Sequence, residues 1–307
     1  MKYAVITIVM AVVLILFLGY RMAAPPYIDF AAAGENQSLP AYDNEDQRPL
    51  RIALASVLSP NETIGYYRTI ADHISHHTGR KVTLIQRKTY SDIILLMSNG
   101  DVDVAFFSTG AYASYQGMNE IELLVMAHYM GNSLYQTDVV VHKDSQITSI
   151  EELQGKVFAF TDPLSYSGHL VILDVLNHNH TTPERFFSRY FYTYNHDKSL
   201  WAVANKIADG ASLDSQIYEY AKEKKPELTE NIRIIKSLGP APTGPVVISK
   251  KVSREQVKQL QDVFLSMHTD PETAKALRGL MIDKFVVPVP ELYEPLRNLY
   301  REKRELL

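Results

Sequence analysis

The sequence has no cysteine among its 307 residues. This absence excludes disulfides, thiolate ligands for zinc or iron–sulfur clusters, and cysteine nucleophiles. It also excludes a lipoprotein anchor, because that anchor needs a cysteine directly after the signal segment. Cysteine-free chains occur in oxidising and reducing compartments alike, so the absence does not by itself place the protein.

The chain also lacks a large excess of either charge. Its 31 lysines and arginines face 35 aspartates and glutamates, and the resulting net charge of −4 does not indicate a nucleic-acid partner. Hydrophobic residues make up 46% and charged residues 21%, which is enough apolar material for a sizeable core. The length favours two domains of roughly 100–150 residues each.

Catalytic patterns are missing too. We find no nucleophile with a placed base, no paired-carboxylate site and no Walker-type loop, so we expect no enzymatic activity and no cofactor. His73 and His77 have the i, i+4 spacing of metal ligands on a predicted helix, with His76 beside them. No third ligand is suggested, and a polar helix end explains these histidines better than a metal site.

The N-terminus carries an uncharged apolar run, Tyr3 to Tyr20, which is just long enough to cross a membrane as a helix. A cleaved signal peptide is the alternative, although its apolar centre is usually about 7–15 residues long. Small residues at a suitable spacing for cleavage lie well beyond the run, at 31–33. We therefore favour an uncleaved anchor in residues 1–23, followed by a flexible tether over 24–49, with the remainder of the chain exported.

Beyond residue 50 the pattern alternates between short apolar strands and amphipathic helices. This alternation is typical of the α/β class, with parallel sheets flanked by helices. The expected strands are 51–56, 81–86, 102–107, 138–144, 156–162, 191–195 and 246–251. The expected helices are 61–78, 90–99, a helix that begins at Gly168, 253–268 and 290–307.

Two loops share one design. Ser108-Thr109-Gly110 and the segment 162–168 (DPLSYSG) each follow a predicted strand and open a predicted helix. Free backbone N–H groups, hydroxyl donors and the positive end of the helix dipole meet at such a point and favour an anion. A single loop of this kind is usually only a helix cap. A matching pair, one in each half of the chain, predicts an anion site between the halves.

Residues 50–290 resemble the periplasmic solute-binding proteins of phosphonate, phosphite and phosphate ABC importers. The resemblance depends on YSDIILLMSNGDVDVAFFSTGAYA (90–113) and on SIEELQGKVFAFTDPLSYSGHLV (149–171). It implies a type II periplasmic-binding fold, in which two α/β lobes joined by two crossing segments close on the ligand. Lobe 1 would be 50–137 plus 241–307, and lobe 2 would be 138–240.

The resemblance also implies a set of ligand-binding residues. The family's oxygen-binding loop corresponds to Ser165, Tyr166, Ser167 and Gly168. Two aromatic positions that line the family's cleft correspond to Tyr90 and Tyr135, and a polar position that reaches the oxyanion corresponds to His196. Ser108 and Thr109 stand where relatives often carry Gly-Pro, so the first loop departs from the family pattern. No metal ligand is implied.

The ligand implied by the resemblance is a small phosphorus oxyanion. Relatives that bind aminoalkyl phosphonates carry an acidic residue in a segment where this chain has none, 239–244. Phosphate, phosphite or methylphosphonate is therefore expected to bind at least as well as an aminated ligand. Asp214 is the acidic residue that could substitute if the fold brings it to the cleft.

The resemblance implies that the protein delivers its ligand to an ABC permease in the inner membrane. It would act in the periplasm, or at the extracytoplasmic face, anchored to the cytoplasmic membrane through residues 3–20. The alternative is an anchored sensory domain of the same fold that signals to a kinase or another receptor.

Overall fold

The computed structural model describes residues 48–55 and 57–302. The expected anchor at 1–23 and nearly all of the expected tether at 24–49 lie outside these residues. Within the part of the chain that is described, no helix is long and apolar enough to cross a membrane.

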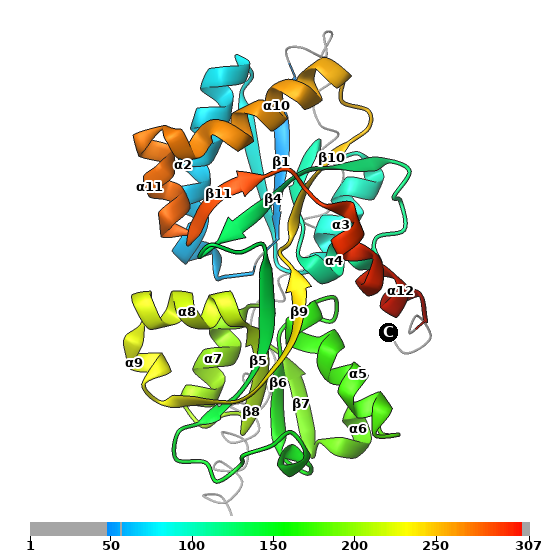
Figure 1. Ribbon diagram of the computed structural model, residues 1–307, viewed down its shortest axis with the longest axis vertical. Helices are drawn as coiled ribbons and strands as arrows, with labels where there is room; N and C mark the ends of the chain where they lie inside the picture. The colour runs from blue at the N-terminus through cyan, green and yellow to red at the C-terminus, as the bar shows by residue number, and fades with distance from the viewer. Residues whose placement is uncertain (1–47, 56, 303–307) are drawn as a thin grey trace, which may run out of the picture. The chain divides into compact units, whose positions relative to one another are not determined.

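The first sheet has six strands in the order β11-β4-β10-β3-β1-β2 (Figure 1). Its strands are β1 (Leu50–Ala55), β2 (Val82–Arg87), β3 (Val104–Phe106), β4 (Ile121–Tyr129), β10 (Pro245–Ser249) and β11 (Ile282–Val286). β1 pairs in parallel with β2 and β3, whereas β10 runs antiparallel to β3 and β4 and β11 runs antiparallel to β4. The predicted parallel pairing is therefore present, but only in part of the sheet, which is mixed. β10 enters directly from the second sheet, not through a helix, and so runs against its neighbours.

The second sheet has five strands in the order β7-β6-β8-β5-β9. They are β5 (Leu134–His142), β6 (Val157–Phe160), β7 (Arg189–Tyr192), β8 (Gly210–Asp214) and β9 (Ile232–Pro242). β6 is parallel to β7 and β8, and β5 is antiparallel to β8 and β9. This sheet is also mixed, because β5 enters directly from the first sheet and not through a helix.

Helices cover both faces of the first sheet, because alternate strand residues point to opposite faces. One face packs around Ile74 and Phe264 and is covered by α2 (Pro60–Thr78), α10 (Arg254–Ser266) and α11 (Pro271–Gly279). The other packs around Tyr90 and is covered by α3 (Tyr90–Asn99) and α4 (Thr109–Ser114).

The second sheet is covered in the same way. One face carries α5 (Val171–His178) and α6 (Pro183–Phe186), and the other carries α7 (His196–Ala204), α8 (Ser215–Lys224) and α9 (Pro226–Thr229). The last helix, α12 (Glu294–Glu302), adds Leu296 and Tyr300 to the core around α5. Short 3₁₀ turns lie at Glu151–Leu153, Met267–Thr269 and Pro290–Tyr293.

The chain passes between the sheets at 130–133, before β5, and at 243–244, before β10 (Figure 1). The two passages lie side by side, since the Thr243 amide donates to the Ser133 carbonyl at 3.0 Å. The expected lobe boundaries fall inside β5 and β9 and stay a prediction.

Candidate functional site

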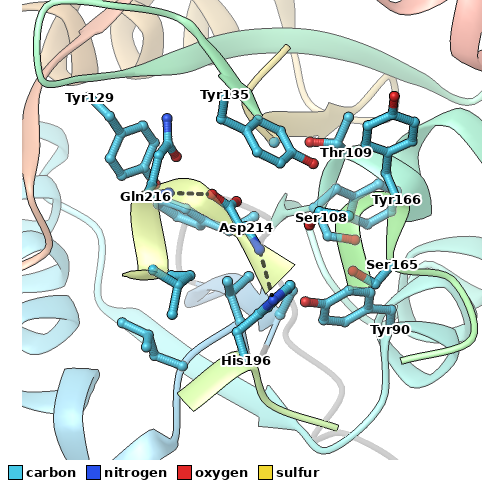
Figure 2. Close-up of a pocket in the computed structure, with 18 of the residues that line it drawn as sticks. Tyr90, Ser108, Thr109, Tyr129, Tyr135, Ser165, Tyr166, His196, Asp214 and Gln216 are labelled. Carbon is cyan, nitrogen blue, oxygen red and sulfur yellow. Dashed lines mark hydrogen bonds between the residues drawn. The ribbon is translucent and has the colours of Figure 1, made fainter. Parts of the chain in front are cut away.

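A pocket of about 100 Å³ lies where strand ends and loops of the two sheets meet (Figure 2). All the predicted site residues except Gly168 line it: Tyr90, Ser108, Thr109, Tyr135, Ser165, Tyr166, Ser167 and His196. Pockets for drug-sized ligands are roughly 300–1,000 Å³. This pocket therefore suits a small ligand such as an inorganic or one-carbon anion.

The second loop shapes one wall of the pocket. Ser165 begins a π-helical turn, Tyr166–Leu170, and its Oγ accepts a hydrogen bond from the Gly168 amide at 3.0 Å. The Ser165 hydroxyl proton thus stays available to a ligand. A side chain at Gly168 would collide with Thr161 and Ser165, so Gly168 allows the loop to close tightly and does not itself face the pocket.

The first loop is a weaker donor than expected. Ser108 caps α4 by accepting from the Ala111 amide at 3.2 Å, and the Thr109 hydroxyl donates to the Pro242 carbonyl at 2.8 Å. Because the Thr109 proton is already committed, this hydroxyl offers the pocket an oxygen and not a proton. The α4 helix is also only six residues long, which limits its dipole.

Two tyrosines supply neutral donors. The Tyr90 ring is fully buried and its hydroxyl has no hydrogen-bond partner among the described residues. Burial raises the pKa of Tyr90 well above its ordinary value, so the hydroxyl keeps its proton. Burial and then the charge of Asp214 raise the pKa of Tyr135 in the same way, with the Thr109 and Ser167 hydroxyls beside it.

His196 is neutral. Burial lowers the pKa of its imidazole to about 3. Its Nδ1 accepts a hydrogen bond from the Asp214 amide at 3.2 Å (Figure 2), which leaves the ring proton on Nε2. The side chain therefore brings one N–H donor and no charge at neutral pH.

Asp214 lines the pocket, so the fold does bring this acidic residue to the cleft, where it could pair with an aminated ligand. Its carboxylate caps α8 by accepting from the Gln216 amide at 2.8 Å, and burial raises its pKa to about 7. The expectation that an aminated ligand gains nothing rested on the lack of an acidic partner, and that basis is removed. Sequence analysis missed Gln216, which also lines the pocket, because nothing marks it before the fold is known.

No lysine or arginine occurs among the described residues that line the pocket. The remaining wall is mostly apolar and aromatic, formed by Ala55, Val57, Leu58, Tyr67, Phe106, Phe107, Tyr129, Ile217 and Leu280. A negative ligand here must therefore be held by neutral donors in a partly apolar enclosure.

Several contacts join the two sides of the pocket. The Asp162 carboxylate accepts from the Tyr90 amide at 3.1 Å, and the Ser59 hydroxyl donates to Asp197 at 2.6 Å. An ion pair joins Lys225 to Glu62 at 2.8 Å. These bonds link elements of the first sheet to elements of the second, so we expect them to stabilise a closed pocket.

Replacing Asp197 with Ala is expected to weaken ligand binding about tenfold or more. Its carboxylate accepts from both the hydroxyl and the amide of Ser59, and each hydrogen bond to a charged group contributes roughly 1.5–3 kcal/mol. Asp197 does not line the pocket, so the effect must come from a shift toward the open form. Calorimetric titration measures it. Arg254→Ala is the control, because it breaks a surface ion pair with Glu122 that does not join the two sheets. This variant should leave the ligand affinity unchanged. Equal affinity in both variants would contradict the closing role.

The fold and this enclosed pocket together define a two-lobed solute-binding protein. The chain belongs to the family of periplasmic substrate-binding proteins of phosphonate ABC transporters, whose family model matches residues 52–293. That family is one of binding proteins and not of enzymes, and membership places the chain in the periplasm.

Individual relatives agree with this assignment. The chain is 25% identical over 269 residues to the phosphonates-binding periplasmic protein of Escherichia coli (strain K12), covering 85% of this chain and 78% of the relative. It is 25% identical over 201 residues to a phosphate-import protein of Mycolicibacterium smegmatis, covering 61% and 62%.

Among solved structures, a binding component of a phosphonate ABC transporter from Pseudomonas aeruginosa has a TM-score of 0.78 at 26% identity, covering 84% of this chain and 87% of that one. A methylphosphonate-bound protein from Prochlorococcus marinus has a TM-score of 0.75 at 17% identity, covering 83% and 98%. The second likeness supports the fold alone. Both agree with the expected type II periplasmic-binding fold.

Proposed function

We propose that this protein captures a small phosphorus oxyanion in the pocket and presents it for import. The observation that carries the proposal is the convergence of uncharged donors on a small enclosed space. The Tyr90 hydroxyl lies there without a partner among the described residues, near Ser165, Ser167 and the N–H of His196. Relatives in this family are named for phosphonate binding and phosphate import.

Neutral donors can hold a buried anion when each ligand oxygen is hydrogen-bonded. Each such bond is charge-assisted by the ligand and contributes roughly 1.5–3 kcal/mol. Because no cation lines the described pocket, selectivity comes from the positions of the donors and not from net charge. A tetrahedral ion with three or more oxygens can accept hydrogen bonds from all of these donors at once.

Asp214 gives the pocket its response to pH. With a pKa of about 7, the carboxyl group is protonated below neutrality and can donate to a ligand oxygen. Above that pH it carries a negative charge that repels the oxyanion. An ammonium group on the ligand would reverse this preference, because it would pair with the ionised form.

We therefore expect the affinity for methylphosphonate to fall as pH rises from 6 to 9. Above the pKa of about 7, each further pH unit weakens binding by up to about tenfold, because binding must take up a proton. Asn at position 214 keeps the cap on α8 and cannot ionise, so Asp214→Asn should remove this part of the pH dependence. Titration of the ligand itself affects both proteins equally. Parallel pH profiles for the two proteins would rule out the proposed role of Asp214.

The delivery partner we propose is an ABC permease, with the protein held at the membrane by residues 3–20. The apolar run is long enough to span, which supports anchoring. An anchored protein stays with membranes after a high-salt wash, and its mass includes Met1. Release as a periplasmic form that begins near residue 24 or 34 would contradict anchoring and leave the binding function intact.

Calorimetry of the purified protein against phosphate, phosphite, methylphosphonate and aminoethyl phosphonate tests the function itself. The expected result is 1:1 binding of at least one of the four. An aminated ligand that binds at least tenfold tighter than methylphosphonate, and loses this advantage in Asp214→Asn, would identify an aminoalkyl phosphonate as the ligand. No heat with any of the four would refute the proposal.

A further inference from the structure

A second pocket, of about 670 Å³, lies between α3, α4, α12 and the loop residue Leu164. It shares no lining residue with the pocket described above. Its volume is in the range of pockets that hold small organic ligands, roughly 300–1,000 Å³. It is therefore large enough for a ligand different from the one in the first pocket.

Two buried donors in this second pocket have no acceptor. Arg297 Nη1 and the Tyr115 hydroxyl are both buried, and neither donates to a described residue, although Ser98 is hydrogen-bonded to the Tyr115 oxygen. Tyr115 is only 2% exposed, and burial raises the pKa of its hydroxyl, so it remains a donor. Buried polar groups in folded proteins are nearly always hydrogen-bonded, so two orphan donors in one pocket indicate a missing acceptor.

The charge in the second pocket is of one sign. Arg297 and Arg301 both line it, and no aspartate or glutamate occurs among its described lining residues. The Arg297 guanidinium lies 5.9 Å from the centre of the Tyr112 ring, which orients it without neutralising it. Arg301 donates to the Asn298 side chain, a neutral partner. The positive charge of this wall is thus left for a ligand.

We propose that this second pocket binds a small polyvalent oxyanion, with Arg297 as the central contact and Arg301 at the rim. The guanidinium presents a planar fork of N–H groups that matches a carboxylate or a phosphate. The shared chemistry is an anionic group with at least two oxygens, borne by either an organic acid or a phosphate compound.

The test uses the full-length protein in detergent with Ser165→Ala and Ser167→Ala, which disable the first pocket. Pyrophosphate and citrate are titrated separately, because they distinguish a phosphate from a carboxylate ligand. We expect 1:1 binding of at least one probe, weakened tenfold or more by Arg297→Gln. Arg301→Gln, at an exposed position, should weaken it about threefold or more. Arg254→Gln, at an exposed arginine that begins α10, is the matched control and should leave it unchanged.

No binding of either probe overturns the proposal, and so does binding that both arginine variants leave intact. A chain ending at Glu302 should bind as the full chain does. Binding that appears only after this truncation would show that residues 303–307 fill the second pocket, and would also overturn the proposal. None of these results bears on the first pocket, whose function is tested in protein with both serines in place.

Discussion

Replacing Ser167 with Ala is expected to weaken methylphosphonate binding about 10- to 150-fold, the equivalent of one charge-assisted hydrogen bond. Ser167 is 2% exposed and lines the first pocket next to the Tyr135 hydroxyl. Its hydroxyl is hydrogen-bonded to the Tyr135 hydroxyl in the same pocket, so the two side chains can act on one ligand oxygen together. Calorimetric titration of the variant measures the loss.

Ser167 is a cleaner probe than its neighbour Ser165. The Ser165 hydroxyl also caps the turn that follows it, so Ser165→Ala should lose both affinity and roughly 0.5–2 kcal/mol of stability. Ser266→Ala, on the exposed part of α10, is the control and should leave binding unchanged. If Ser167→Ala binds as tightly as the unaltered protein, the second loop is not the oxyanion site.

Replacing Tyr90 with Phe should have two effects of opposite sign. The variant should bind methylphosphonate about 10- to 150-fold more weakly, since a donor to the ligand is lost. In the ligand-free state it should unfold at a higher temperature, with a gain of about 1 kcal/mol, because a buried hydroxyl without a partner is removed. Titration and thermal unfolding measure the two effects.

Tyr293→Phe is the matched control for this pair of effects. The Tyr293 hydroxyl is buried and donates to the Thr243 carbonyl at 2.7 Å, so its removal should lower stability and leave affinity nearly unchanged. A Tyr90→Phe variant that loses stability as Tyr293→Phe does would show that Tyr90 acts in the core and not on the ligand.

Much of the site was predictable because its signals are local. The loop 162–168 is a continuous run between a strand and a helix, so its capping serine and its close-packed glycine can be recognised from the sequence. Tyr90 directly follows the helix-capping residue Thr89. Tyr135 and His196 were predicted from the family resemblance. All of these residues line the pocket except Gly168, whose role is to let the loop close.

The rest depends on contacts between distant segments. The antiparallel entry of β10 between β3 and β4 is set by its direct passage from the second sheet, which no local pattern records. The commitment of the Thr109 proton to the Pro242 carbonyl depends on the same passage. The local sequence around Asp214 indicates only an ordinary helix cap. The tertiary fold places this residue in the pocket, where burial raises its pKa.

The crystal structure of the methylphosphonate complex tests the central claim most directly. We expect the phosphorus group inside the pocket of about 100 Å³, with its oxygens within hydrogen-bond distance of Ser165, Ser167, Tyr90 and His196 Nε2. No lysine or arginine should touch it. A ligand bound outside this pocket, or held by an arginine or lysine side chain, would contradict the account of a small anion bound by neutral donors.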